Sequence, residues 1–239
     1  MEIVRFSHFT FTYPGTSAPA LADVTLAVDA GRFVTLCGGS GSGKTTLLRC
    51  IKPTLAPHGA KAGEICFAGQ PTDALTQRTD CTEIGFVMQE PDAQIVTDKV
   101  WHELAFGLEN LGLPNAEIRA RVAETAAFFG IEGWFDRDVS TLSGGQKQLL
   151  NLAAVMTMRP SLLLLDEPTS RLDPIAAERF FDALVRINRE TGTAVILSEH
   201  RLDAAFAVSD RVILLDGGRV IADGAPTAVG DNLRAHPHP

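Results

Sequence analysis

Residues 38–45 of the 239-residue chain are Gly38-Gly39-Ser40-Gly41-Ser42-Gly43-Lys44-Thr45. They match the pattern G-x-x-x-x-G-K-[ST], and they lie after an apolar run at 33–36 and before a predicted helix at 46–51. The glycines allow backbone N–H groups to surround a phosphate, and the helix N-terminus adds a favourable field for its charge. Lys44 can reach the outer phosphates, while the Thr45 hydroxyl is a ligand for Mg²⁺. The stretch therefore predicts a nucleoside triphosphate site.

A different glycine pattern, G-x-G-x-x-G, is typical of dinucleotide sites. It fails here because Lys44 stands where the third glycine is required. A flexible Gly/Ser loop is the remaining alternative, and the expected strand and helix on either side argue against it. A dinucleotide site is therefore disfavoured.

Short apolar runs predict the sheet that carries this loop. They lie at 33–36, 84–88, 162–165, 194–197 and 212–215. Strands that are apolar on both faces are typical of a parallel sheet covered by helices.

Two helices are predicted from their end signals. One begins after Asp173-Pro174 and ends at Gly192, and the other begins at Asn115 and ends at Gly130. Both carry apolar residues at helical spacing, which predicts one face packed on a core.

The chain is therefore expected to be one α/β domain with a P-loop NTPase core of the RecA-like type. Alternating apolar residues predict an antiparallel β-portion at 1–32, and the weak strand signal at 92–159 predicts a helical insert. The core then comprises 33–91 and 160–225, and 226–239 is expected to be a tail with a linker-like His-Pro end.

Composition excludes several other classes of protein. The net charge is −8 with 21% charged residues, and no Lys/Arg run is present, so nucleic acid is not expected as a partner. No apolar stretch approaches the ~18 residues that cross a bilayer. The four cysteines form no C-x-x-C pair, so neither a zinc site nor a disulfide framework is indicated.

Polar residues follow three of the apolar runs. Asp166 and Glu167 follow 162–165, Gln89 follows 84–88, and His200 comes shortly after 194–197. Carboxyl ends of parallel strands share one sheet edge, so these side chains are expected beside the phosphates. An Asp at this position holds Mg²⁺ in P-loop enzymes, and the adjacent Glu can accept a proton from water. Alone, Gln89 and His200 could equally be solvated loop residues.

Leu142-Ser143-Gly144-Gly145-Gln146 resembles the LSGGQ signature of ATP-binding cassette (ABC) ATPases. Ser143 and Gln146 also satisfy a capping box, so the simpler reading is a well-capped helix start. The resemblance implies that Ser143, Gly144 and Gly145 grip the γ-phosphate of ATP held by a partner cassette.

The resemblance also implies roles for other positions. Tyr13 resembles the aromatic residue that stacks on adenine, and Gln89 resembles the Q-loop residue that links Mg²⁺ to the transport partner. Glu167 corresponds to the general base and His200 to the switch histidine. In Ser170-Arg171-Leu172-Asp173, which is similar to the D-loop, Arg171 replaces the usual small residue.

The implied site comprises three sets of residues. The catalytic set is Lys44, Glu167 and His200. The Mg²⁺ ligands are Thr45, Gln89 and Asp166. ATP is held by Tyr13, Gly38, Gly39, Ser40, Gly41, Ser42, Gly43, Lys44, Thr45, Thr46, Gln89, Ser143, Gly144, Gly145 and Gln146.

The segment 89–110 is similar to the ATPases of energy-coupling factor (ECF) and cobalt-type importers. That likeness implies a second cassette, a transmembrane coupling protein contacted through Gln89–Asn110, and a substrate-binding membrane component. It implies uptake of a vitamin or transition-metal ion, with the chain peripheral at the cytoplasmic face of the cell membrane. For Trp101, Leu104, Phe106 and Leu108 the alternative is simple helix packing.

Other functions stay open at this point. One is the ATPase of a conventional importer that depends on a substrate-binding protein. Another, from a different class, is a soluble ABC protein acting on nucleic acid or ribosomes, which the single cassette and the negative charge disfavour. A non-catalytic nucleotide sensor is disfavoured because Glu167 and His200 are both present.

Overall fold

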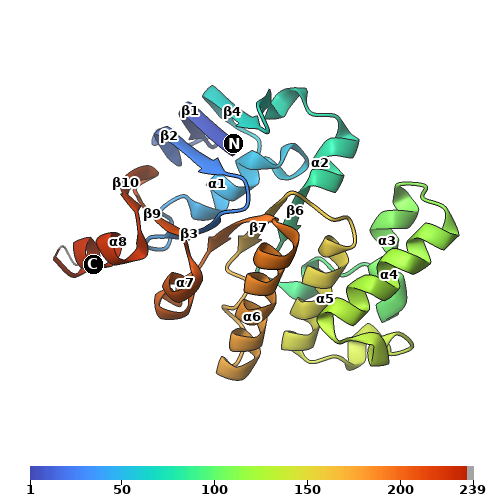
Figure 1. The fold of residues 1–239 in the computed structure, drawn as a ribbon. Coiled ribbons are helices and arrows are strands. Elements are labelled where there is room, and N and C mark those ends of the chain that lie inside the picture. The colour runs from blue at the N-terminus through green and yellow to red at the C-terminus, as the bar shows by residue number, and fades with distance from the viewer. Residues whose placement is uncertain (236–239) are drawn as a thin grey trace.

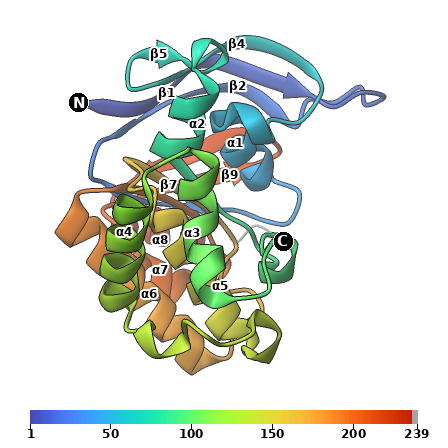
Figure 2. The ribbon, with the colours of Figure 1, turned by 90° about the vertical axis from the view of Figure 1, so that its right-hand side faces the viewer.

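The computed structural model describes residues 1–235 of the chain (Figures 1 and 2). The strands are β1 (Glu2–Thr12), β2 (Leu21–Asp29), β3 (Phe33–Cys37), β4 (Ala60–Phe67), β5 (Gln70–Pro71), β6 (Ile84–Val87), β7 (Leu162–Asp166), β8 (Ala194–Ser198), β9 (Arg211–Asp216) and β10 (Arg219–Gly224). The α-helices are α1 (Lys44–Ile51), α2 (Gln77–Glu83), α3 (Val100–Asn110), α4 (Asn115–Phe129), α5 (Gly144–Met156), α6 (Pro174–Thr191), α7 (Leu202–Val208) and α8 (Pro226–Ala235). Short 3₁₀ turns are η1 (Pro53–Leu55), η2 (Thr72–Ala74), η3 (Pro91–Ala93), η4 (Glu132–Trp134) and η5 (Val139–Thr141).

The larger sheet has the strand order β10-β9-β3-β8-β7-β6. The strands β9, β3, β8, β7 and β6 pair in parallel, which confirms all five predicted runs. Strand β10 adds an antiparallel edge strand that the sequence did not predict. Successive side chains of a strand point to opposite faces. Thus Leu162 and Leu164 pack in the cluster that includes α1, whereas Leu163 and Leu165 pack in the cluster that includes α6.

The smaller sheet is antiparallel, with the order β2-β1-β4-β5. The predicted β-portion at 1–32 is present as β1 and β2, which pair with each other. Residues 60–71, expected in the P-loop core, instead form β4 and β5 of this sheet. The sequence signal was weak because only the last three residues of β4, Ile65–Phe67, are buried.

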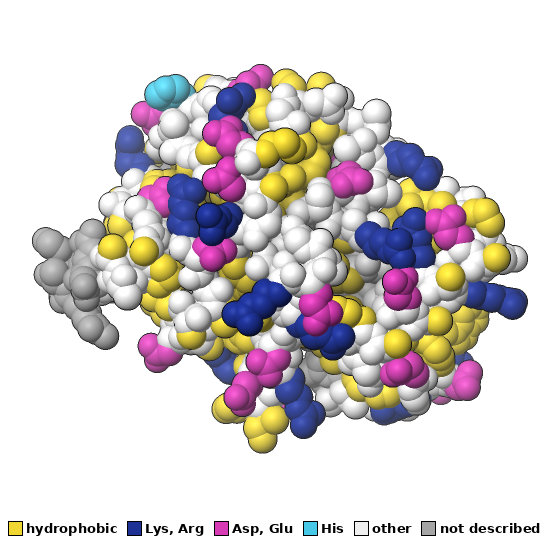
Figure 3. Space-filling view, in the orientation of Figure 1, with side chains coloured by type: hydrophobic (Ala, Val, Ile, Leu, Met, Phe, Trp, Pro, Cys, Tyr) yellow, Lys and Arg dark blue, Asp and Glu magenta, His cyan; other side chains and the backbone are white. Residues whose placement is uncertain are grey.

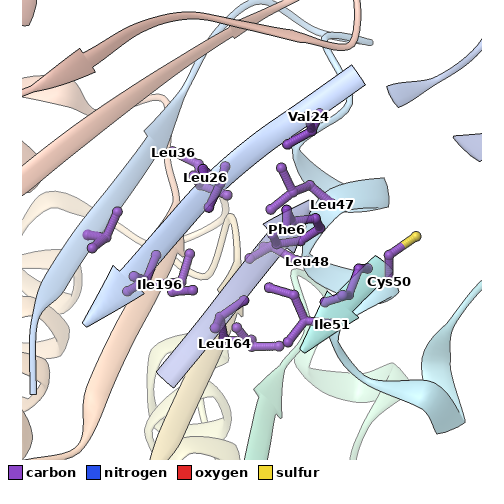
Figure 4. Packing of buried hydrophobic residues seen from close by; sticks show 14 of the residues in the cluster. Phe6, Val24, Leu26, Leu36, Leu47, Leu48, Cys50, Ile51, Leu164 and Ile196 are labelled. Carbon is purple, nitrogen blue, oxygen red and sulfur yellow. The ribbon is translucent and has the colours of Figure 1, made fainter. Parts of the chain in front are cut away.

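Helix α1 lies between the two sheets (Figure 4). Its Leu47, Leu48 and Ile51 are almost completely buried. They pack with side chains of the antiparallel sheet, such as Phe6, and of the parallel sheet, such as Leu164. This packing fixes the N-terminus of α1, and with it the phosphate-binding loop.

Residues 92–159 form the expected helical insert, a separate lobe built on α3, α4 and α5 (Figure 1). It has its own core, which includes Leu104, Leu108 and Leu150. The predicted ends of α4 and α6 are confirmed, since Gly130 and Gly192 end them with φ of 66° and 72°.

The C-terminal segment differs from the expected tail. Residues 226–235 form α8, in which Val229 is 2% exposed and packs with Val212 and Leu214 of β9. The His-Pro end at 236–239, expected to be a linker, lies outside the described residues. Within residues 1–235 no helix has the length and hydropathy needed to cross a membrane.

Candidate active site

The loop between β3 and α1 requires glycine at two positions. Gly38 has φ of 142°, and a Cβ there would lie 2.1 Å from the Leu215 carbonyl oxygen. Gly43 has φ of 105°, and a Cβ there would lie 2.7 Å from the Ala20 carbonyl oxygen. Other residues are strained at such φ values, so the loop can take this shape only with glycine.

A buried cation and an unpaired hydroxyl lie in this loop. Lys44 is 4% exposed, and its Nζ donates to the carbonyl oxygens of Gly38 and Gly39 at 2.9 and 3.0 Å. The Ser42 hydroxyl is buried and has no hydrogen-bond partner among the described residues. An ammonium group and a free donor are what anionic phosphate oxygens require, so the loop fits the predicted ligand.

Asp166 lies at the carboxyl end of β7 and faces the first turn of α1. Its Oδ1 accepts hydrogen bonds from the Thr45 hydroxyl at 2.8 Å and the Ser198 hydroxyl at 3.0 Å. Carboxylate and hydroxyl oxygens are suitable ligands for Mg²⁺. Asp166 and Thr45 therefore form a donor set that fits this ion, as the sequence predicts.

The Glu167 carboxylate lies close to three other residues of the predicted site. Its Oε1 lies 2.8 Å from Nε2 of His200 and 4.0 Å from Nζ of Lys44, and its Oε2 accepts from Nε2 of Gln89 at 3.3 Å. The structure thus brings these four side chains together from separate segments.

The backbone at Glu167 is strained. Its φ is 46°, a left-handed conformation that costs a non-glycine residue about 1–3 kcal/mol. The Glu167 N–H donates to both the carbonyl and the hydroxyl oxygen of Ser198, at 3.1 and 3.0 Å. Ser198 therefore holds Asp166 and Glu167 in place together.

Tyr13 lies beside the first turn of α1. Its hydroxyl is 3.0 Å from the Thr46 hydroxyl, and its ring packs edge-on against Phe11 with centroids 4.9 Å apart. The side chain is 36% exposed. An exposed aromatic ring at this end of the loop is compatible with the stacking role that the resemblance implies.

The signature residues lie at the N-terminus of α5. The capping box is complete, because the Ser143 N–H donates to Oε1 of Gln146 at 2.9 Å and the Gln146 N–H donates to the Ser143 hydroxyl at 3.3 Å. A Cβ at Gly145 would lie 2.9 Å from Cβ of Ala176. Across residues 1–235, no hydrogen bond or ion pair joins the signature to the loop at 38–45, and α5 belongs to the other lobe (Figure 2).

The residues on either side of Gln89 are hydrogen-bonded to α5. The side-chain amides of Gln148 and Asn151 donate to the carbonyl oxygens of Met88 and Pro91, each at 3.0 Å. The side chain of Gln94 bridges the backbone of residues 86–88, since it accepts from the Met88 N–H and donates to the Phe86 carbonyl.

Sequence reasoning missed Ser198, Glu199 and Thr169. Glu199 is 1% exposed and accepts a hydrogen bond from the Thr169 hydroxyl at 2.6 Å. Ser198 ends β8, and Glu199 precedes His200. His200 was predicted because it is a polar residue that follows a buried parallel strand. The same rule applies to Ser198 and Glu199, so it could have found these two residues.

A cavity of about 410 Å³ lies elsewhere. Its lining includes Phe128 and Phe129 of α4 and the residues Ser161 and Thr193 that precede β7 and β8. It therefore opens at the edge of the sheet opposite Asp166, and no residue of the predicted site lines it.

The comparisons with known proteins agree with this geometry. A family model described as ABC transporter matches residues 21–170, which include the loop at 38–45, Gln89, the signature and Glu167. The chain belongs to the ABC transporter family. It carries the ATPase domain of that family, and its fold is the ABC ATPase fold.

Curated relatives of this ABC domain include a putative ABC transporter ATP-binding protein from Bacillus cereus, 47% identical over 96% of this chain. The chain spans about 41% of the length of that relative. The energy-coupling factor transporter ATP-binding protein EcfA1 from Lactobacillus delbrueckii subsp. bulgaricus is 37% identical, over 95% of this chain and 80% of its own.

Solved structures give the same result. CbiO1 from Clostridium perfringens, described as part of the ABC transporter complex CbiONQ, is 31% identical with a TM-score of 0.88, covering 98% of this chain and 92% of its own. An ATP-binding cassette described as a dimeric post-hydrolysis state bound to ADP and Pi is 27% identical with a TM-score of 0.81, covering 93% and 98%.

Proposed function

We propose that this ABC domain is the ATP-hydrolysing subunit of an ECF-type importer that takes up a vitamin or a transition-metal ion. It would bind its membrane partners at the cytoplasmic face of the cell membrane as a peripheral protein. The observation that carries the ATPase part is the convergence of Gln89, His200 and Lys44 on Glu167. The names of the ECF and CbiO relatives support the importer type.

The residues of the site have separate roles in ATP binding and hydrolysis. Lys44 and the backbone N–H groups of the loop bind the β- and γ-phosphates, and Tyr13 stacks on the adenine. Glu167 accepts a proton from the attacking water, and His200 contacts the γ-phosphate. Thr45, Asp166 and Gln89 would hold Mg²⁺, which neutralises charge on the transferred phosphoryl group.

The ATP site is expected to be completed by a second cassette, either another copy of this chain or a paralogue. Gly144 supports this: its φ is not in the left-handed region, and a Cβ there would meet no atom within 4 Å. Nothing in this chain therefore requires glycine at that position, whereas a γ-phosphate bound by a partner would. Ser143, Gly145 and Gln146 would also contact the ATP held by the partner.

The segment Gln89–Asn110 is expected to contact the transmembrane coupling protein. Leu104 and Leu108 are fully buried in the core of the insert, so they serve helix packing. Trp101 and Phe106 remain 45% and 39% exposed, and Val96 is 62% exposed. Exposed large apolar side chains on one segment are typical of an interaction surface.

Purification of the tagged chain from detergent-solubilised membranes tests the importer assignment. Integral membrane proteins should be recovered with the wild-type chain and lost with Trp101→Ala combined with Phe106→Ala. Ile221→Ala is the matched control, because Ile221 is 43% exposed but lies on β10. Recovery of a permease and its substrate-binding protein would contradict the ECF assignment.

A nucleic-acid role would be indicated by ATPase stimulation with RNA. We expect none, because basic and acidic side chains are interspersed on the face shown in Figure 3 and the net charge is −8.

A further inference from the structure

The buried carboxylate next to the switch histidine has no role in the mechanism above. Glu199 lies between β8 and α7, directly before His200, and is 1% exposed. Burying a carboxylate is costly unless hydrogen bonds or ion pairs compensate it. Its contacts therefore indicate what this side chain does.

Both oxygens of Glu199 accept hydrogen bonds from the surrounding loops. Oε2 accepts from the Thr169 hydroxyl at 2.6 Å, and Oε1 accepts from the backbone N–H groups of His200 and Arg201 at 2.9 and 3.2 Å. Thr169 lies two residues after Glu167 and directly before the D-loop residue Ser170. One carboxylate thus joins the start of the D-loop to the backbone of the switch histidine.

A second contact joins the same two segments. Nη2 of Arg201 donates to the Leu172 carbonyl oxygen at 2.7 Å. Residues 169–172, which include most of the D-loop, are therefore hydrogen-bonded to residues 199–201 at two separated points, Thr169 and Leu172. The imidazole of His200, 49% exposed, is held at its backbone while its Nε2 contacts Glu167 at 2.8 Å.

We propose that Glu199 is a positioning residue that sets the place of His200 against Glu167 according to the place of the D-loop. This inference rests on the proposed function, in which a second cassette closes on this chain to complete the ATP site. A shift of the D-loop on cassette closure moves Thr169 and Leu172. The hydrogen bonds of these two residues to Glu199 and Arg201 then transmit the shift to His200. Closure and catalysis are then coupled through these hydrogen bonds.

The test is ATP hydrolysis by the full chain with substitutions at both ends of the hydrogen bond between Thr169 and Glu199. Glu199→Ala and Thr169→Val should lower kcat about tenfold to 100-fold, because a displacement of roughly 1 Å can cost that much, while KM for ATP changes less than about twofold. Glu199→Gln should retain most activity, because its carbonyl can still accept from the two N–H groups and its amide can donate to Thr169. Asp203→Ala, an exposed carboxylate on α7, is the matched control and should have no effect.

A double-mutant cycle separates positioning from a purely structural role. In a His200→Ala background, Glu199→Ala should cause no further loss of kcat, because its effect passes through His200. Additive losses, wild-type kcat in Thr169→Val, or an equal loss in Glu199→Gln and Glu199→Ala would overturn the proposal. Should Glu199→Ala fail to fold, Thr169→Val alone decides. Absence of hydrolysis by the wild-type chain would instead contradict the proposed function.

Discussion

At the scale of single residues, the site depends on a few polar contacts around Glu167. Its strained backbone and its contacts with Lys44, Gln89 and His200 place one carboxylate at the meeting point of several segments. Strain of this kind persists only where the surrounding structure holds it, here through the two hydrogen bonds to Ser198.

Lys44→Ala should weaken ATP binding by about 10-fold to 100-fold, because it removes the buried charge-assisted donor of the loop, worth about 1.5–3 kcal/mol. Isothermal titration with ATP measures this. Lys61→Ala is the matched control, since Lys61 lies on β4 and pairs with Asp73 at 3.4 Å. An unchanged affinity in Lys44→Ala would contradict the loop assignment.

The burial of the cysteines predicts which thiols react with a reagent at pH 8. Burial raises the pKa of the Cys37 thiol to about 11 and that of the Cys50 thiol to about 12. Both therefore stay protonated at pH 8, and only the thiolate reacts. A thiol reagent at pH 8 should label the exposed Cys81 rapidly and these two only after unfolding, as mass spectrometry of the labelled peptides would show. Rapid labelling of Cys37 in the native chain would contradict the packing.

At the scale of elements, much of the fold follows from local rules. Continuous apolar runs predicted the parallel strands, and Asp173, Gly130 and Gly192 predicted helix ends, because those signals are local. The place of β4 was missed because its pairing with β1 is long-range and most of its residues are exposed. For the same reason, the contact between Glu199 and Thr169 could not be predicted, since tertiary packing brings them together.

The loop at 95–97 depends on one carboxylate of α3. Glu103 is 6% exposed and accepts from the N–H groups of Val96 and Thr97 and from the Thr97 hydroxyl. Glu103→Gln removes the charge and one acceptor oxygen, and should lower the free energy of unfolding by about 1–3 kcal/mol. Urea denaturation measures this loss. Glu109→Gln, at an exposed position of α3, should change it by less than about 0.5 kcal/mol, and equal effects would contradict this role of Glu103.

At the scale of the whole molecule, the two lobes separate the loop at 38–45 from the signature at 142–146 (Figure 1). Under the proposed function, one chain supplies both halves of an ATP site but does not bring them together. A head-to-tail pair of cassettes would, and the dimeric relative bound to ADP and Pi is similar to this chain in fold.

Complementation between inactive variants tests the pairing of two copies. Lys44→Ala has an intact signature, and Gly144→Asp has an intact loop, so each alone should be inactive. An equal mixture should recover roughly a quarter of wild-type hydrolysis, because half of the dimers then contain one intact site. Phosphate release measures the recovery. No recovery would contradict a composite site formed by two copies of this chain.

In the proposed mechanism, Glu167 activates water for ATP hydrolysis in this ABC domain. The most direct measurement is phosphate release by the wild-type chain and by Glu167→Gln, at ATP concentrations that saturate both as judged by titration. We predict equal ATP binding, with hydrolysis reduced about 100-fold or more in the variant, since general base catalysis contributes about 10²–10⁴. Unchanged steady-state hydrolysis by Glu167→Gln would contradict this role of Glu167.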